Sequence, residues 1–202
     1  MANKQIYLQD KYTNRAQREG FKARSAYKLL ELQEKFNLIL PGQTVVDLGC
    51  APGSWLQVSL RLVGPEGKVI GIDKTKINLT ANNLVFYQLD LIKDSEKIIS
   101  ALPPAHIVLS DLAPSTSGIA VVDNAKSLKL AQTAWNIARK LLLPQGNFVC
   151  KVFSSKESDD FFKLLKPYFA SLSKFKPKAS RKSSKEYYIV GQNLKQRQKT
   201  TN

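Results

Sequence analysis

Of all segments in the sequence, residues 44–55 give the most information about possible chemistry, through the types and spacing of their side chains. Residues 44–46 are β-branched and Asp47 follows them, which indicates a buried strand with a carboxylate near its carboxyl end. A tight turn then leads into a helix over residues 54–63, and its turn residues are Gly49, Pro52 and Gly53. A strand, a glycine-containing loop and a helix N-terminus form a common cofactor-binding corner of α/β sheets.

The order of residues in this loop favours S-adenosylmethionine as the cofactor. A dinucleotide fingerprint would read Gly-x-Gly-x-x-Gly and a Walker loop would require Gly-Lys-Ser/Thr, whereas residues 49–53 read Gly-Cys-Ala-Pro-Gly. S-adenosylmethionine carries an amine, a sulfonium and a ribose diol but no phosphate, so its site needs carboxylate acceptors and close approach of the backbone. The alternative is an ordinary turn, because any tight strand-to-helix connection can be rich in Gly and Pro.

Two further acids at predicted strand ends support the same site. Asp73 ends a strand over residues 68–73, at roughly the separation of about 20 residues at which an acid meets an adenosine ribose in βαβ folds. Asp90 follows a strand over residues 85–89 and could accept the adenine amino group. Each acid alone is consistent with an ordinary strand-end Asp. Three successive strands that end on Asp47, Asp73 and Asp90 favour the cofactor interpretation.

Two lysines and one more acid are candidates for the chemistry itself. Lys151 interrupts the apolar strand of residues 147–153, and a lysine inside a buried strand is costly unless it is paired or deprotonated. The alternative for Lys151 is a strand-end side chain that reaches solvent. Lys28 borders an apolar helical stripe, where a surface lysine is the simpler interpretation. Asp111 ends a strand over residues 106–111, at the edge where open α/β sheets bind ligands.

The charge balance points to a polyanionic partner. The chain has 202 residues, with 31 Lys and Arg against 16 Asp and Glu, and a formal net charge of +15. Such an excess favours nucleic acid first and an anionic membrane second, with a merely basic surface as the alternative. Residues 1–24 are basic with interleaved aromatic residues, as in a nucleic-acid-binding arm or a solvated leader. We find no apolar run that could span a membrane, no signal peptide and no basic amphipathic helix.

Cysteine and histidine usage argues against a metal site. Cys50 and Cys150 are isolated, no Cys-x-x-Cys occurs, and the single histidine, His106, has no partner in the sequence, so no zinc site is predicted. The same pattern suits a reducing cytosol, and the predicted localisation is cytoplasmic. His106 is expected at a partly exposed strand edge, and Trp135 on the buried face of a helix.

The order of elements predicts a Rossmann-like α/β fold. Strands alternate with helices as far as Tyr168 and two strands then pair directly. This order predicts a seven-stranded, mostly parallel sheet with an antiparallel edge strand and helices on both faces, the arrangement of S-adenosylmethionine-dependent methyltransferases. Ser25 and Asp123 are expected to cap helices, and a further helix is expected over residues 159–168. The last two strands are expected near residues 172–177 and 186–191.

The predicted organisation is a single domain with basic ends. A basic arm is expected over residues 1–24, one methyltransferase domain over residues 25–192, and a basic, disordered tail over residues 193–202.

Several segments together resemble the FtsJ/RrmJ family of RNA ribose 2′-O-methyltransferases, namely residues 47–55, 110–118 and 148–153. Residues 21–32 and 181–191 extend the resemblance over nearly the whole domain. The chain length is similar to that of the family's large-subunit ribosomal RNA enzymes, which have no extra RNA-binding domain. One departure is Ser54, where relatives often have a second glycine.

The resemblance implies roles for particular residues. The family uses a Lys-Asp-Lys-Glu tetrad, which is matched by Lys28, Asp111, Lys151 and Glu186. S-adenosylmethionine would be held by Gly53, Trp55, Asp73, Asp90 and Asp111. Lys151 would accept or steer the proton of the ribose hydroxyl, with an uncharged amine and an orienting ammonium both consistent with the sequence. No metal is implied, because the methyl donor needs no Lewis acid.

The activity that the resemblance implies is methylation of a ribose 2′-hydroxyl in RNA. The expected substrate is a uridine in the peptidyl-transferase A-loop of large-subunit ribosomal RNA, and the expected enzyme is a monomer that binds neither DNA nor membranes. Two alternatives stay open. The same chemistry could act on tRNA or another RNA, or the protein could be a non-catalytic RNA-binding factor for ribosome assembly on a methyltransferase scaffold.

Overall fold

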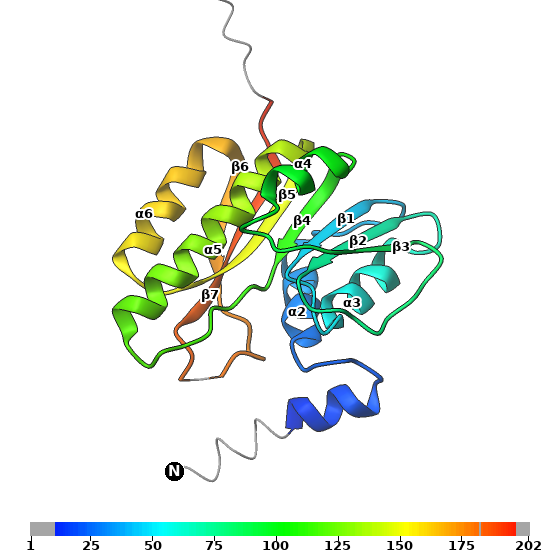
Figure 1. Ribbon diagram of the computed structural model, residues 1–202, viewed down its shortest axis with the longest axis horizontal. Helices are drawn as coiled ribbons and strands as arrows, with labels where there is room; N and C mark the ends of the chain where they lie inside the picture. The colour runs from blue at the N-terminus through cyan, green and yellow to red at the C-terminus, as the bar shows by residue number, and fades with distance from the viewer. Residues whose placement is uncertain (1–10, 182, 197–202) are drawn as a thin grey trace, which may run out of the picture.

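The structure is a computed structural model that describes residues 11–181 and 183–196 (Figure 1). In this part of the chain seven strands form one sheet in the order β3-β2-β1-β4-β5-β7-β6. The strands are β1 (Thr44–Leu48), β2 (Lys68–Asp73), β3 (Leu84–Gln88), β4 (Ala105–Ser110), β5 (Leu142–Phe153), β6 (Phe169–Phe175) and β7 (Glu186–Leu194).

Helices pack against the sheet between most of these strands. They are α2 (Ala26–Phe36), α3 (Ser54–Val63), α4 (Ser95–Ala101), α5 (Ala120–Leu141) and α6 (Lys156–Leu165), which the 3-10 turn η1 (Lys166–Tyr168) continues. Residues 11–18 form another helical segment, and Ala16 and Phe21 are buried in the same core cluster as α2. The predicted basic arm therefore has a packed part. Its first ten residues, and residues 197–202 of the predicted tail, lie outside the described residues.

The strand pairing confirms the predicted methyltransferase-type sheet. β3, β2, β1, β4 and β5 pair in parallel, whereas β7 is antiparallel to both β5 and β6. The antiparallel strand lies one place inside the edge, because β7 enters between β5 and the edge strand β6. This insertion brings the start of β7 beside the end of β5, where Glu186 pairs with Phe153.

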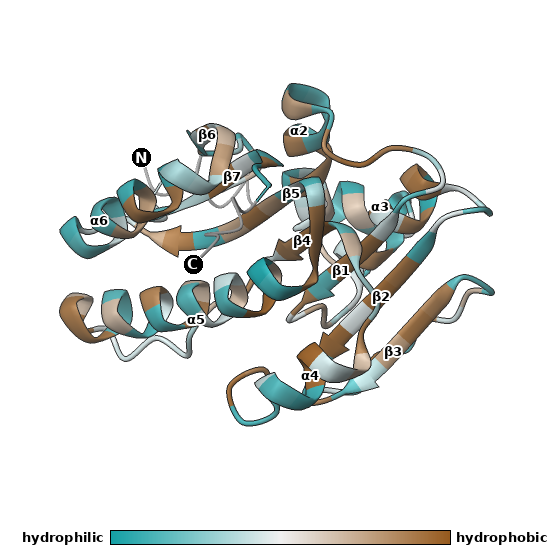
Figure 2. Cartoon of the chain, turned by 90° about the horizontal axis from the view of Figure 1, so that it is seen from above, coloured by the Kyte–Doolittle hydropathy of each residue, from teal (hydrophilic) through white to brown (hydrophobic). Residues whose placement is uncertain are grey.

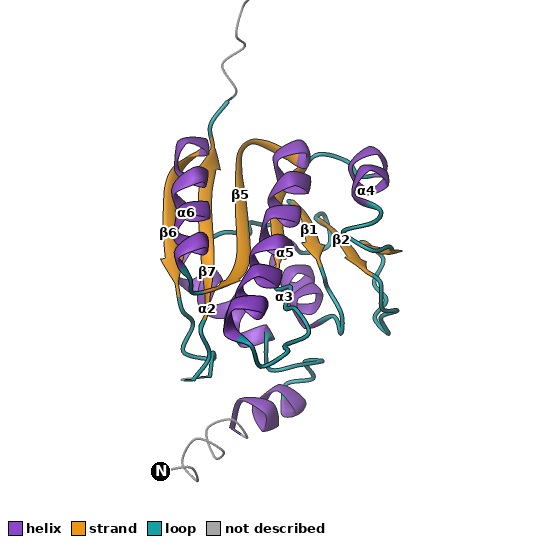
Figure 3. Cartoon of the chain, turned by 60° about the vertical axis from the view of Figure 1, so that its left-hand side comes forward, coloured by secondary structure: helices purple, strands orange, loops and turns teal. Residues whose placement is uncertain are grey.

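Residues of the central strands alternate between two cores, one on each face of the sheet. Val45 packs in the cluster that contains α2 and α3, whereas Val46 and Leu48 pack in the cluster that contains α5 and α6. Figure 2 shows α2 and α3 on the opposite side of the sheet from α4 and α5, and Figure 3 shows α5 and α6 in front of the strands. Both faces are therefore covered. The period of two places Asp47 on the α2/α3 face with Val45.

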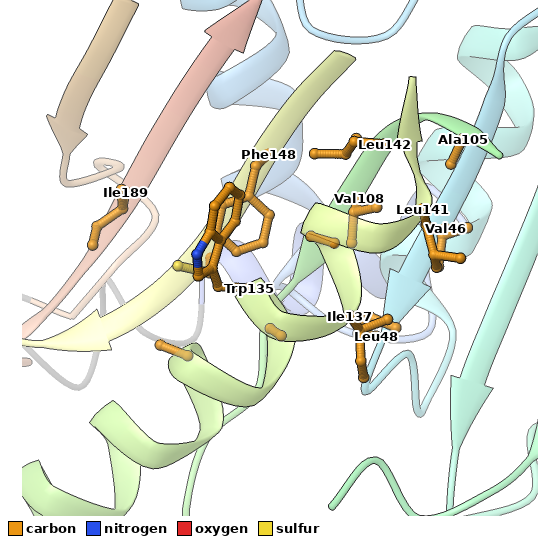
Figure 4. Packing of buried hydrophobic residues seen from close by; sticks show 14 of the residues in the cluster. Val46, Leu48, Ala105, Val108, Trp135, Ile137, Leu141, Leu142, Phe148 and Ile189 are labelled. Atoms are coloured by element: carbon orange, nitrogen blue, oxygen red, sulfur yellow. The ribbon is translucent and has the colours of Figure 1, made fainter. Parts of the chain in front are cut away.

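Trp135 anchors α5 to the sheet, as its helical spacing predicted (Figure 4). It is 4% exposed, and its ring centroid lies 5.4 Å from that of Phe148 and 5.5 Å from that of Phe169. Aromatic pairs of this kind contribute about 0.5–1.5 kcal/mol each beyond the area they bury. They hold α5 against β5, the strand that carries Lys151.

The start of α5 and the presence of α4 differ from the sequence-based expectation. α5 begins at Ala120 rather than at Asp123, because Asp123 lies in its first turn and accepts hydrogen bonds from the backbone N–H groups of Ser117 and Gly118. Asp123 thus holds the preceding loop instead of capping the helix. α4 was not predicted, since Ile98 is its one buried residue and leaves no apolar period to detect.

Two other helix starts are also corrected. Ser25 precedes α2, but its side chain makes no capping hydrogen bond and instead lies 2.7 Å from the Ser54 hydroxyl. α6 begins at Lys156, three residues before the predicted start, behind a capping box formed by Ser155 and Ser158. In both cases a local hydroxyl partner that the sequence pattern did not single out decides the geometry.

Candidate active site

The loop between β1 and α3 packs against β2 at the carboxyl edge of the sheet. The backbone N–H groups of Gly49 and Cys50 donate to the carbonyl oxygen of Ile72 at 2.8 and 3.2 Å. Gly49 has a φ of +78°, and a Cβ there would stand 2.1 Å from the Leu112 side chain. Gly53 has a φ of +108° where α3 begins. Both positions therefore favour glycine, which lets the chain turn sharply beside the next loop.

A cavity of about 420 Å³ opens between this loop and the loops that follow β2, β3 and β4. Asp73, Asp90 and Asp111 line it together, although they come from three different strand ends. Leu112 and Pro114 supply an apolar part of the wall. Carboxylates around one partly apolar space suit a ligand that carries a cationic centre and a diol. We call this space the acidic cavity.

Backbone N–H groups fix two of these carboxylates. The Asp73 carboxylate accepts hydrogen bonds from the N–H groups of Ala51 and Thr75 at 3.0 and 2.7 Å. The Asp90 carboxylate accepts from Ile92 and Lys93 at 2.9 and 3.2 Å. These backbone hydrogen bonds hold the pKa of Asp90 below its usual range. Each carboxylate has further acceptor positions, so both can orient a ligand while they hold their own loops.

Gly53 and Trp55, the other two residues implied in cofactor binding, are not among the residues that line the acidic cavity. Gly53 gives α3 its starting conformation. Trp55 is buried, its indole N–H donates to the carbonyl oxygen of Ser25 at 2.9 Å, and its ring stacks on Tyr188. In this structure Trp55 therefore joins α3, the residue before α2, and β7.

The four tetrad residues come together as two ion pairs. Lys28 Nζ lies 2.5 Å from the Glu186 carboxylate, and Lys151 Nζ lies 2.9 Å from the Asp111 carboxylate. Lys151 also donates to the backbone carbonyl oxygen of Asp111 at 2.7 Å. The side chains come from α2, the loop after β4, β5 and β7, so only the folded sheet can assemble them.

Strand register explains why these groups meet. Lys151 pairs with Tyr188 across β5 and β7, and Glu186 is two residues before Tyr188 on the same face of β7. Val149, Leu109 and Val45 belong to the α2/α3 core, so the period of two directs Lys151 to that face as well. Figure 1 shows the loop after β4 and the β6–β7 connection at the same end of the sheet's strands.

Tyr188 joins the two ion pairs and was not predicted from the sequence. Its hydroxyl donates to the Asp111 carboxylate at 2.6 Å, and the Lys28 ammonium lies 5.9 Å from the centre of its ring. Its ring also stacks on Trp55, with centroids 5.7 Å apart. Burial, and then the negative charges of Asp111 and Glu186, raise the pKa of Tyr188 well above its usual range. The phenol therefore stays a hydrogen-bond donor. Its place two residues after Glu186 is the signal that could have identified it.

Because the tetrad is buried, each of its charges needs a contacting partner of opposite sign. The Lys151 side chain is 5% exposed and that of Lys28 is 10% exposed. A buried charge of this kind is tolerated when a partner of opposite sign is in contact. Burial alone would raise the pKa of Glu186, but the charges of Lys28 and Lys151 and the hydrogen bond from Lys28 lower it overall.

A second cavity, of about 360 Å³, opens on the other side of the tetrad. Its wall is basic and polar, formed by Arg24, Lys28, Arg181, Ser183, Ser184 and Glu186. Burial, followed by the positive charge of Arg181, lowers the pKa of Arg24, which indicates that the two guanidinium groups lie close enough to repel. We call this space the basic cavity. A phosphate between two guanidinium groups would relieve their repulsion.

S-adenosylmethionine fits the residues around the acidic cavity. Asp47, under the Gly49–Ala51 loop, is fully buried, and neither of its carboxylate oxygens has a hydrogen-bond partner among the described residues. With Asp73 and Asp111 it makes a concentration of acids that a cationic ligand would balance. No phosphate-binding lysine lines the Gly49–Gly53 turn itself. The donor set therefore suits a sulfonium nucleoside better than a nucleotide.

Neither a cluster of metal ligands nor a membrane-spanning helix is found in the part of the chain that the structure describes. The described residues contain no group of three or more His, Cys, Asp or Glu side chains that could hold a metal ion. His106 is half-buried at the other end of β4, where its Nδ1 accepts from the Thr44 backbone N–H at 3.1 Å. In the same part of the chain, every helix is too short or too polar to cross a bilayer.

Two solved structures with a similar fold are described as methyltransferases. A protein of Plasmodium falciparum described as a ribosomal RNA methyltransferase is 29% identical, with a TM-score of 0.77 over 86% of this chain and 98% of that one. Human methyltransferase-like protein 13, solved with SAH, is 13% identical, with a TM-score of 0.55 over 80% of this chain and 76% of that one. The second likeness shows the fold alone.

Sequence comparison gives the family. Ribosomal RNA large subunit methyltransferase E of Bdellovibrio bacteriovorus is 43% identical over 189 residues, which cover 90% of this chain and 95% of that protein. The protein of the same name in Acinetobacter baylyi is 45% identical over 193 residues, which cover 94% of this chain and 89% of the relative. Residues 21–194 match the model of FtsJ-like methyltransferases. The chain therefore belongs to the FtsJ-like methyltransferase family.

Proposed function

We propose that the protein methylates the 2′-hydroxyl of a ribose in large-subunit ribosomal RNA, at a uridine of the peptidyl-transferase A-loop. One observation carries this proposal. Two buried Lys–carboxylate pairs, joined through Tyr188, lie between an acidic cavity and a basic cavity. Relatives at 43% and 45% identity, named as large-subunit ribosomal RNA methyltransferases, support the choice of RNA.

The methyl donor is S-adenosylmethionine, which supplies a methyl group made electrophilic by its positive sulfur. Asp73, Asp90 and Asp111 would hold it in the acidic cavity. Gly53 and Trp55 would complete the site from the first turn of α3. Because backbone N–H groups already orient Asp73 and Asp90, these carboxylates need little rearrangement to bind the ligand.

Lys151 is the proposed proton acceptor, in the uncharged amine form that it takes after it has released its own proton to solvent. A ribose hydroxyl is a weak acid, so its oxygen becomes a better nucleophile as its proton passes to an amine. The Asp111 carboxylate and the Asp111 carbonyl oxygen both lie within hydrogen-bond distance of Lys151 Nζ. They would stabilise the ammonium that forms. They occupy two of its three donor positions and leave the third for the ribose oxygen.

Lys28 and Glu186 are proposed to position the RNA on the opposite side. The Lys28–Glu186 pair forms part of the wall of the basic cavity, next to Arg24 and Arg181. Guanidinium groups bind phosphates through two parallel hydrogen bonds, so this cavity suits a backbone phosphate close to the target ribose. Holding the ribose in line with the donor would supply a large part of the rate.

The decisive experiment incubates the protein with labelled S-adenosylmethionine and, in parallel, whole large ribosomal subunits, naked ribosomal RNA or tRNA. The modified nucleotide is then mapped. We expect one 2′-O-methyl group in large-subunit RNA. Methylation of tRNA alone would favour the tRNA alternative. Binding of S-adenosylmethionine with no turnover on any RNA would favour a non-catalytic assembly factor.

We further propose that the enzyme acts as a cytoplasmic monomer, with a basic arm over residues 1–24, one domain over residues 25–192 and a basic tail over residues 193–202. All four tetrad residues come from one chain, so the site needs no second copy. Light scattering of the purified protein tests the monomer, cell fractionation tests the location, and limited proteolysis tests the two boundaries.

A further inference from the structure

Asp47 is a buried carboxyl group that the proposed reaction does not use. It lies in β1 between β2 and β4, and pairs with Gly71 and Leu109 in register. Its exposed fraction is 0%, and both carboxylate oxygens lack a hydrogen-bond partner among the described residues. An ionised carboxylate is strongly disfavoured there, because burial removes it from solvent and no group of the described residues donates a hydrogen bond to it.

The nearest acidic side chains make ionisation of Asp47 harder still. Asp73 and Asp111, at the ends of the two neighbouring strands, are both negatively charged groups that face it. Burial first, then Asp111 and Asp73, raise the pKa of Asp47 well above its usual range. Cys50, in the loop that follows β1, stays a neutral thiol, since burial and the nearby Asp47 raise its pKa, so it does not change the charge around Asp47.

The positively charged side chains on the surrounding elements interact with groups other than Asp47. On β5, Lys151 is paired with Asp111, and on α2, Lys28 is paired with Glu186. The one charged side chain of α3 is Arg61, whose guanidinium lies over the ring of Phe21, 4.4 Å from its centre. Among the described side chains of β5, α2 and α3, no positive charge therefore offsets Asp47.

The ligand expected in the acidic cavity would change this balance. This step rests on the proposed function, which places a methyl donor beside Asp73 and Asp111. The donor has a permanent positive charge on sulfur, whereas its product has a neutral sulfur and otherwise the same groups. A positive charge in a weakly polarisable site acts strongly on a buried carboxyl group nearby.

We propose that Asp47 is protonated while the acidic cavity is empty, and that it releases its proton to solvent when the cationic methyl donor binds. The carboxylate that remains then stabilises the donor but not the neutral-sulfur product. Asp47 is thus a specificity-determining residue that favours exchange of product for donor. It acts from beneath the loop and touches neither the reacting oxygen nor Lys151.

Thermodynamic linkage fixes the sign of the effect. If binding releases a proton, affinity rises with pH in the range between the pKa of Asp47 in the complex and its higher pKa in the free protein. One titrating group gives a rise of about tenfold per pH unit at most. The product, which lacks the sulfonium, should show a smaller rise, so the ratio of the two affinities should increase with pH.

Isothermal titration calorimetry measures the released proton directly and needs no RNA. S-adenosylmethionine and S-adenosylhomocysteine are each titrated into the full chain in phosphate and in Tris, because the two buffers absorb a proton with different enthalpies. We expect release of up to one proton with S-adenosylmethionine and markedly less with S-adenosylhomocysteine. Asp47→Asn should abolish the difference. Equal proton counts for both ligands would overturn the proposal.

A matched control separates this effect from general changes in charge. Asp160 lies on α6, and its side chain is 58% exposed, so Asp160→Asn should leave both proton counts as in the parent protein. Proton release that persists unchanged in Asp47→Asn would assign it to another group and overturn the proposal. Failure of the RNA methylation assay with normal proton release would instead reject the proposed function and leave Asp47 in this role.

A second measurement does not depend on the variant folding. Carbon-13 NMR of the unmodified protein, labelled at aspartate carboxyl carbons, follows Asp47 in the free and bound states. We expect the chemical shift of a protonated carboxyl group in the free protein and of a carboxylate after S-adenosylmethionine is added. A carboxylate shift in both states, or a protonated shift in both, would contradict the proposed switch.

Discussion

The acidic and basic cavities differ in what holds their charges in place. In the acidic cavity, backbone N–H groups orient Asp73 and Asp90 before any ligand is present. In the basic cavity, Arg24 and Arg181 face one another and Glu186 gives partial compensation. The first side is preorganised for one small cationic ligand. The second has the unbalanced positive charge that a polyanion would neutralise.

The boundary between the two cavities is the place where chemistry is expected. Asp111 lines the acidic cavity and pairs with Lys151, whereas Glu186 lines the basic cavity and pairs with Lys28. Tyr188 connects the two pairs. A change on one side should therefore affect one ligand, and a change at the boundary should affect turnover without either binding step.

The largest expected effect is at the boundary. Lys151→Ala should lower methyl transfer by about 10²- to 10⁴-fold, the usual contribution of a positioned acid or base. Binding of S-adenosylmethionine should be retained. Single-turnover rates with ribosomal subunits and calorimetric affinities measure the two quantities. Lys163→Ala is a suitable control, because Lys163 lies on α6 with its side chain 75% exposed. Normal turnover by Lys151→Ala would remove Lys151 from the chemistry.

A smaller effect is expected from the acidic side. Asp73→Asn should weaken S-adenosylmethionine binding by about 10- to 100-fold, because hydrogen bonds to a charged group contribute about 1.5–3 kcal/mol. RNA binding should not change, since Asp73 stands on the far side of the tetrad from the basic cavity. Filter binding of RNA beside calorimetry of the cofactor checks both. Equal loss of both ligands would mean that the two cavities are not independent.

The basic side should respond mainly to salt. The double variant Arg24→Ala/Arg181→Ala should weaken RNA binding and reduce the slope of log affinity against log salt by about 1 to 2. Binding of S-adenosylmethionine should stay as in the parent protein. Arg139→Ala at the far end of α5 is the matched control, because this arginine is exposed and lines neither cavity. An unchanged salt slope in the double variant would exclude a phosphate site there.

Local patterns in the sequence were enough to locate the edge of the sheet where the site lies. They did not identify the side chain that connects the two ion pairs of the site. Asp73, Asp90 and Asp111 could be identified because strand ends of a parallel sheet share one edge. Lys151 could be singled out because it interrupts an apolar strand. Tyr188 was hidden by its hydrophobic strand, although its spacing of two from Glu186 places both on one face.

Other features depend on contacts that no local spacing encodes. Arg24 and Arg181 are far apart in the chain, and their approach follows from how α2 and the β6–β7 connection pack together. Glu31 on α2 contributes to that packing by accepting hydrogen bonds from the backbone of Lys178 and Ala179. Asp47 was recognised as a strand-end acid, but only the packed sheet shows that no hydrogen-bond partner for its carboxyl group lies within residues 11–181 and 183–196.

The smallest expected effect concerns stability, and it tests the buried acid between the strands. Because the folded-state pKa of Asp47 is raised, its contribution to stability is complete below its unfolded pKa of about 3.9 and is lost as pH rises toward its folded pKa. The amide introduced by Asp47→Asn does not titrate. The variant should therefore become more stable relative to the parent protein as pH increases from about 5 to 8. We expect the difference in the free energy of unfolding to widen by at most about 1.4 kcal/mol per pH unit, the linkage of one proton. Urea denaturation of both proteins across this range measures it. A difference that stays constant from about pH 5 to 8 would mean that Asp47 is ionised in the free protein, and the acidic cavity would then carry its full negative charge before the donor arrives.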